Sequence, residues 1–99
     1  MSLAPRIVLH APISDPALLE PFVEACLRDK VVLIAVVGEG CKDVEDLIDE
    51  IIVGDGSDPD RFIATTSHPD EPLEEVLLSV SIWPTGTGGA GAAVDQVRL

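Results

Sequence analysis

The chain has 99 residues, enough for one domain, and its 18 acidic and 6 basic residues give a formal net charge of −12. Phosphate backbones and anionic membranes attract basic surfaces, so this charge argues against nucleic acid and membranes as partners. Hydrophobic residues make up 46% of the chain and aromatic residues only 3%, which predicts an aliphatic core. Such a core is typical of a parallel sheet that is covered on both faces.

The cellular setting is predicted from what the sequence lacks. Nothing in the first residues resembles the apolar core of a secretion signal, and the longest apolar run, 31–37, is much shorter than the roughly 20 residues that span a bilayer. The two cysteines, Cys26 and Cys41, are too few for a disulfide framework. We therefore expect a soluble protein in the reducing environment of the cytoplasm.

The first predicted strand, 6–11, is followed by a predicted helix. Ser14 or Asp15 is suited to cap this helix, with Pro16 in its first turn. The apolar residues that recur at helical spacing are Leu18, Leu19, Phe22, Val23, Cys26 and Leu27. Pro21 argues against this helix, because proline lacks the N–H that a helix interior requires.

The second predicted strand, 31–37, is an unbroken apolar run that ends at Gly38, which indicates burial on both faces. A tight turn then leads into an amphipathic helix over 43–53, whose acidic residues are expected to face water. The acidic residues of that face are Asp43, Glu45, Asp46, Asp49 and Glu50.

A third strand is predicted over 61–66, and a third helix begins near Pro72. Its apolar stripe consists of Leu73, Val76, Leu77 and Val80. Residues 84–99 are mostly small and rich in glycine, so we expect them to form a flexible tail outside a single α/β domain, 1–83.

The element order β-α-β-α-β-α predicts an α/β fold on a small three-stranded parallel sheet, a Rossmann-like half domain. Two strand orders are open. Order 2-1-3 places the first two helices on opposite faces of the sheet, and order 1-2-3 places them on the same face. The apolar second strand is either central or an edge that pairs with another molecule, since an exposed apolar edge promotes aggregation. On this ground we expect a homodimer.

Polar residues gather where the predicted strands end, which is where ligands bind in open α/β sheets. These residues are His10, Glu39, Cys41, Thr65, Thr66, Ser67, His68 and Asp70. Their types suit a divalent metal, acid–base catalysis or thiol chemistry, but their spacing is diagnostic of none of these. We therefore predict no metal and no cofactor. In the alternative interpretation, Ser67 and His68 only satisfy the turn and cap the third helix, while His10 fills a strand end. The spacing from Ser67 to Asp70 resembles a weak capping box.

Three segments resemble an uncharacterised family of short bacterial α/β proteins. They are DRFIATTSHPDEPLEEV at 60–76, GEGC at 38–41 and VEDLID at 44–49, and the resemblance covers about residues 5–78. In that family a Thr-Thr pair precedes an aromatic residue, a histidine, acidic residues and Leu-Glu-Glu-Val. Ser67 stands where the aromatic residue is expected. The resemblance implies the α/β fold and no activity.

The sequence holds no complete catalytic motif, so the leading hypothesis is a non-catalytic cytoplasmic protein-interaction module that self-associates. The alternative is a small enzyme, or a ligand or metal binder, that uses His10, Cys41, Thr66 and His68 at the strand ends. In that alternative the candidate catalytic residues are His10, Cys41 and His68, while Thr65, Thr66, Ser67, His68 and Asp70 are the candidate ligand-binding residues.

Overall fold

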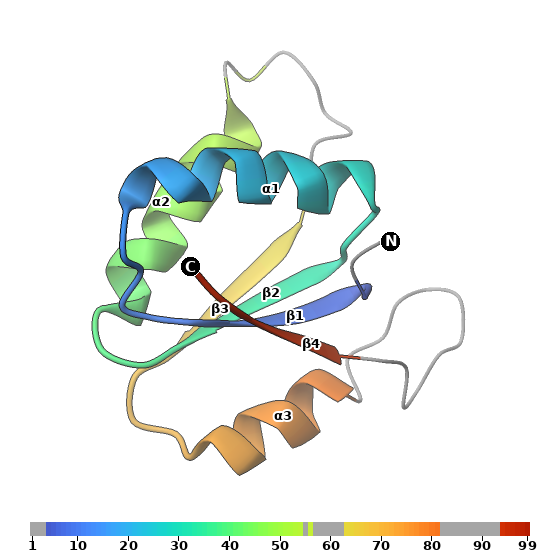
Figure 1. The fold of residues 1–99 in the computed structure, drawn as a ribbon. Coiled ribbons are helices and arrows are strands. Elements are labelled where there is room, and N and C mark those ends of the chain that lie inside the picture. Colours follow the sequence, from blue (N-terminus) through green and yellow to red (C-terminus); the bar gives the residue numbers. More distant parts are fainter. Residues whose placement is uncertain (1–3, 55, 57–62, 82–93) are drawn as a thin grey trace.

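The computed structural model describes residues 4–54, 56, 63–81 and 94–99 (Figure 1). Within these residues the fold is a four-stranded parallel sheet in the order β3-β2-β1-β4. The strands are β1 (Arg6–His10), β2 (Leu33–Val37), β3 (Ala64–His68) and β4 (Val94–Arg98). The helices are a short 3₁₀ turn η1 (Pro16–Leu18), α1 (Leu19–Arg28), α2 (Cys41–Val53) and α3 (Leu73–Ser81).

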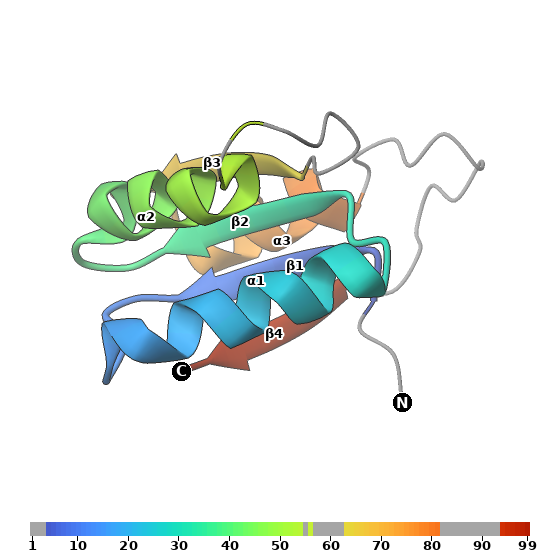
Figure 2. The same ribbon diagram turned by 90° about the horizontal axis from the view of Figure 1, so that it is seen from above.

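The helices cover the sheet from both sides. Helices α1 and α2 lie on one face and α3 lies on the other (Figures 1 and 2). Figure 2 looks onto the first face, with α1 over β1 and β4 and α2 over β2 and β3. This is the arrangement predicted for strand order 1-2-3. None of the helices in the described part of the chain is long and apolar enough to cross a membrane.

The expectation of three strands was wrong, because residues 94–98 form a fourth. They pair in parallel with β1, from Arg6 opposite Val94 to His10 opposite Arg98. The segment has only five residues and about half of them are polar, so neither its length nor its composition distinguishes it from a loop. Its partner strand, β1, lies at the other end of the chain. The rest of the predicted tail, 84–93, lies outside the described residues.

Strand β2 is an interior strand, paired with β1 on one side and β3 on the other. All five of its residues are buried, as its apolar sequence predicts. The alternative in which this strand forms an exposed edge is therefore wrong. The homodimer stays a prediction, but the apolar edge that motivated it does not exist.

The alternation of side chains along the strands builds two cores. The core under α1 and α2 takes Ile7 and Leu9 from β1 and Ile34 and Val36 from β2. The core under α3 takes the intervening residues Val8, Leu33, Ala35 and Val37, together with Val76 and Val80 of the helix. Each fully buried Val, Leu or Ile side chain contributes about 1.5–3 kcal/mol, so the two central strands supply much of the stability.

Pro21 does not break α1, because it is the third residue of the helix. The first four amides of a helix have no intrahelical acceptor, so the missing N–H costs nothing there. Asp15 caps the preceding 3₁₀ turn as predicted, and its carboxylate accepts a hydrogen bond from the Ala17 amide at 3.0 Å. The chain thus enters α1 through a tight turn that has its own cap.

Strand β3 ends later than predicted. Ser67 and His68 are its last residues, paired with Val36 and Val37 of β2, and they do not belong to the following turn. Because α3 begins only at Leu73, the interpretation that Ser67 and His68 belong to the turn and cap this helix is wrong. Pairing with β2 extends the strand over residues whose polar character alone favours a turn.

Candidate functional site

The carboxyl ends of the strands share one edge of the sheet, as the sequence predicted. The register places His68, Val37, His10 and Arg98 in one row across β3, β2, β1 and β4. Neighbouring strands lie about 4.8 Å apart, so the main chains of the two histidines are separated by roughly 10 Å, with β2 between them. The common edge therefore holds two separate histidine environments.

The predicted site residues also divide between the two faces of the sheet. Cys41 and Thr65 face the α1–α2 layer, whereas His10, Thr66 and His68 are on the α3 face, since they alternate in step with residues of that core. Glu39 and Asp70 are exposed in loops. Among the residues that the structure describes, no group of three or more His, Cys, Asp and Glu side chains is arranged to hold a metal ion.

Neither cysteine is placed for catalysis. Cys41, the first residue of α2, is only 1% exposed and belongs to the core, so it is not part of a reactive rim. Cys26 is fully buried, as predicted, and neither cysteine is in a disulfide. Burial, and secondarily the charge of Asp29, raises the pKa of Cys26 to about 12. Both thiols are structural parts of the α1–α2 core.

The raised pKa of Cys26 predicts a loss of stability at alkaline pH. The unfolded chain releases the thiol proton near pH 9.0, whereas the folded protein keeps it to about pH 12, so the free energy of unfolding falls as the pH rises through this window. At pH 10.5 we expect a loss of about 2 kcal/mol from this group. Urea unfolding at pH 8 and pH 10.5 measures it. Cys26→Ala should lose correspondingly less between the two conditions, and an identical loss in both proteins would contradict the prediction.

Thr65 connects β3 to α2 through two carboxylates. Its hydroxyl lies 2.6 Å from Asp49 Oδ1 and 3.2 Å from Glu45 Oε2, and its single proton is donated to one of them at a time. Glu45 was expected to face water, but it is only 9% exposed, because β3 covers it on one side and Lys42 lies 3.5 Å away on the other. The i, i+4 spacing of Glu45 and Asp49 indicates that both carboxylates lie on one face of α2. That this face meets Thr65 depends on the position of β3 beside α2, which the spacing does not predict.

His68 lies between a hydroxyl and a carboxylate. Its Nε2 is 2.8 Å from Thr66 Oγ1, and its Nδ1 is 3.0 Å from Glu71 Oε1. A carboxylate can only accept, so Nδ1 donates to Glu71, and in the neutral ring Nε2 accepts from the Thr66 hydroxyl. The His68 side chain is 16% exposed and that of Glu71 is 50% exposed. Glu71 was not among the predicted site residues, although its position three residues after His68 was a usable signal.

His10 has a different environment, beside β4. Its Nε2 lies 3.0 Å from Gln96 Oε1, and nearby the Leu99 carbonyl accepts hydrogen bonds from both the amide and the hydroxyl of Ser14. This is the place where the strand order reverses, the usual ligand position in open α/β sheets. Here the start of the following helical segment is capped by the carboxylate of Asp15, which disfavours an anion such as phosphate.

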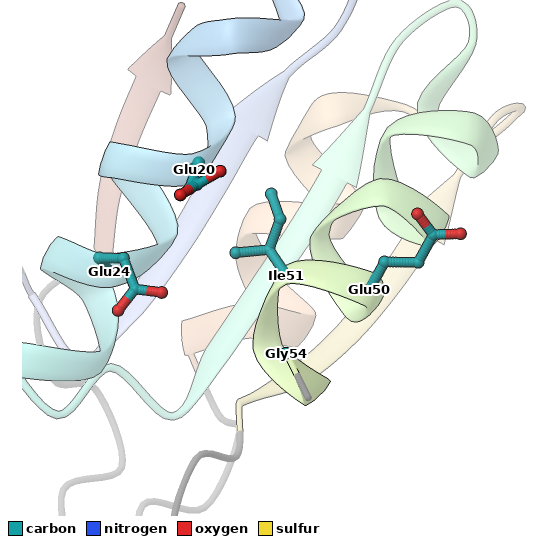
Figure 3. A pocket seen from close by; sticks show the side chains of 5 residues that line it. All are labelled: Glu20, Glu24, Glu50, Ile51 and Gly54. Carbon is teal, nitrogen blue, oxygen red and sulfur yellow. The ribbon is translucent and has the colours of Figure 1, made fainter. Parts of the chain in front are cut away.

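An open acidic groove of about 340 Å³ lies between α1 and α2 (Figure 3). Its lining residues are Glu20 and Glu24 of α1 and Glu50, Ile51 and Gly54 at the end of α2. Figure 3 shows Ile51 between the two helices, with Glu20 and Glu24 on the opposite helix. The carboxylates give this groove a negative field, but acidic side chains alone do not identify a ligand.

Known sequences place the chain in a family without assigning it an activity. The sequence profile of a domain of unknown function, DUF7684, matches residues 5–80. The chain belongs to this family. No curated protein and no solved structure matches it. The match agrees with the resemblance to an uncharacterised family, and it includes β1, β2, β3 and the Thr66–His68–Glu71 group while stopping before β4.

Proposed function

We propose that this DUF7684 protein is a cytoplasmic protein-interaction module that binds an extended, basic segment of a partner protein by strand addition to β3. The observation that supports this most strongly is the edge of β3. Among the described residues only β2 pairs with it, and its sequence, ATTSH, contains no proline and no Asp, Glu, Lys or Arg. Natural edge strands usually carry such residues to prevent pairing with another chain.

The main-chain groups of β3 alternate between the two sides of the strand. Ala64 donates to the Val32 carbonyl, so Ala64, Thr66 and His68 direct their main-chain groups toward β2. Thr65 and Ser67 therefore direct their N–H and C=O groups outward. An added strand can pair with these groups, which is how several peptide-binding domains recognise extended ligands.

The charge around this edge favours a basic partner over a second copy of the chain. Glu45 and Asp49 of α2 lie next to Thr65. Lys42 pairs with Glu45 and with Asp46, so three carboxylates face one lysine near this edge. Two copies, each with a formal charge of −12, repel each other, most strongly at low ionic strength. A basic segment instead gains from the same field.

A proline at position 67 tests the proposal, because it removes one outward N–H and leaves the hydrogen bonds to β2 intact. We expect a fluorescein-labelled peptide of alternating lysine and valine to bind the wild-type protein, and Ser67→Pro to weaken binding about tenfold or more, measured by fluorescence anisotropy. Ser67→Ala, which keeps the N–H, should bind like the wild type. Added salt should weaken binding.

Three outcomes would overturn the proposal. The first is equal binding by Ser67→Pro and wild type. The second is equal affinity for a peptide of alternating glutamate and valine. The third is a dimer in sedimentation velocity that strengthens with salt and is lost in Ser67→Pro, which would identify a second copy as the occupant of the edge.

A further inference from the structure

Thr66, His68 and Glu71 form a connected hydroxyl–imidazole–carboxylate group. The distances are 2.8 Å from the hydroxyl to Nε2 and 3.0 Å from Nδ1 to the carboxylate. A nucleophile within hydrogen-bonding reach of a base, with the base oriented by a third group, is the arrangement that activates serine hydroxyls in enzymes, and the threonine hydroxyl has the same chemistry. We propose that this group makes Thr66 a nucleophile toward activated acyl esters. The proposal does not depend on strand addition to β3.

The backbone explains why these three side chains meet. Thr66 and His68 are two residues apart on one strand, so their side chains lie on the same face. The chain turns immediately after His68, which brings Glu71 back to the far side of the ring before α3 begins at Leu73. The imidazole is thus held from both sides, one contact to each ring nitrogen.

The group lies at the open margin of the α3 face. Helix α3 packs mainly over β1, β2 and β4, whereas Thr66 and His68 lie on the edge strand β3, and both are only partly buried (Figure 1). On β2, the register partner of Thr66 is Ala35, a small side chain. The α3 side therefore covers this group only in part.

Nearby residues of the same types are placed differently. Thr65 faces α2 and bonds directly to carboxylates, and the His10 ring is 3.0 Å from the Gln96 amide oxygen rather than from a hydroxyl. Among these described residues, Thr66 is the hydroxyl that contacts an imidazole, and a carboxylate holds that imidazole from its other side. These neighbours provide matched controls.

The reaction proceeds in two balanced steps. In the first, Thr66 Oγ1 forms a bond to the acyl carbon while His68 Nε2 takes the hydroxyl proton; the bond to the leaving alcohol breaks, and His68 returns the proton to it. In the second, His68 takes a proton from water, the hydroxide forms a bond to the acyl carbon, and the bond to Thr66 breaks with return of the proton. The products are an alcohol and a carboxylic acid. Thr66 and His68 are the catalytic residues, and Glu71 is a positioning residue.

Hydrolysis of p-nitrophenyl acetate by the full chain tests the proposal. We expect Thr66→Val and His68→Gln each to lower kcat/KM about 100-fold or more, the usual contribution of a positioned base. Thr66→Ser, which keeps a hydroxyl, should retain turnover. Glu71→Gln should lower kcat without raising KM, and Glu71→Asp should partly restore kcat. His10→Gln and Ser79→Ala, which removes an exposed hydroxyl of α3, should turn over like the wild type.

The site of acylation gives a second measurement. Intact-protein mass spectrometry with peptide mapping should find the acetyl group on Thr66 in wild type and nowhere in Thr66→Val, while circular dichroism verifies that each variant is folded. Three results would each overturn the proposal. They are acetyl groups on lysine or histidine only, a wild-type rate equal to that of Thr66→Val, and equal losses of kcat/KM in His10→Gln and His68→Gln.

Discussion

Gly38→Ala should destabilise the protein by about 3 kcal/mol or more, and lower its Tm by more than about 10 °C. Gly38 follows β2 with φ +97°, a conformation that costs an alanine roughly 1–2 kcal/mol. A Cβ at this position would also overlap the Ala11 carbonyl oxygen and lie 3.1 Å from the Ala11 carbonyl carbon. The Ala11 main chain cannot move away easily, because its amide donates to the Val37 carbonyl at 2.7 Å.

Gly40 is the matched control for this prediction. It also has a positive φ, +77°, but no atom lies within 4 Å of the position that a Cβ would take. Gly40→Ala should therefore lose only the conformational part, about 1 kcal/mol. Urea unfolding of both variants measures the difference, which isolates the contact between the ends of β1 and β2. Equal losses in the two variants would show that this contact contributes nothing.

Deletion of residues 94–99 should prevent cooperative folding and cause aggregation. The deletion removes β4, which pairs with β1 along its whole length. It exposes the edge of Ile7, Val8 and Leu9, which are fully buried. An apolar strand with an open edge promotes association. Domains of this size have only about 5–15 kcal/mol of stability, and the loss of a strand with its packing on both cores removes much of it.

Circular dichroism melts and size-exclusion chromatography of the truncated chain measure this effect. Gln96→Ala is the control, because it keeps the β4 main chain and changes an exposed side chain at a cost within about 0.5 kcal/mol. A truncated protein that elutes as a monomer and melts like the wild type would contradict the prediction and show that residues 94–99 are not needed for folding.

The sequence located the candidate site but did not resolve it. The prediction that strand-end residues share one edge rests on parallel pairing and is confirmed by the row that contains His10 and His68. Whether two such side chains share a face depends on where each strand begins and on its register, because neighbouring residues point to opposite faces. The predicted end of β3 at Thr66 left His68 in a turn, so its placement beside Thr66 and Glu71 was not foreseen.

Local patterns in the sequence by themselves determined the three βα units, their parallel arrangement and the aliphatic core. A run such as 31–37 and the stripe of α2 are readable because strand and helix repeat over a few residues, and right-handed crossovers leave few ways to connect them. Only the tertiary structure decided that β4 exists, that β2 lies inside the sheet and that Glu45 is buried. These features depend on pairing between segments far apart in the chain, such as Arg6 with Val94, and on which face each helix covers. Long-range pairing leaves no periodic trace in the sequence of either partner.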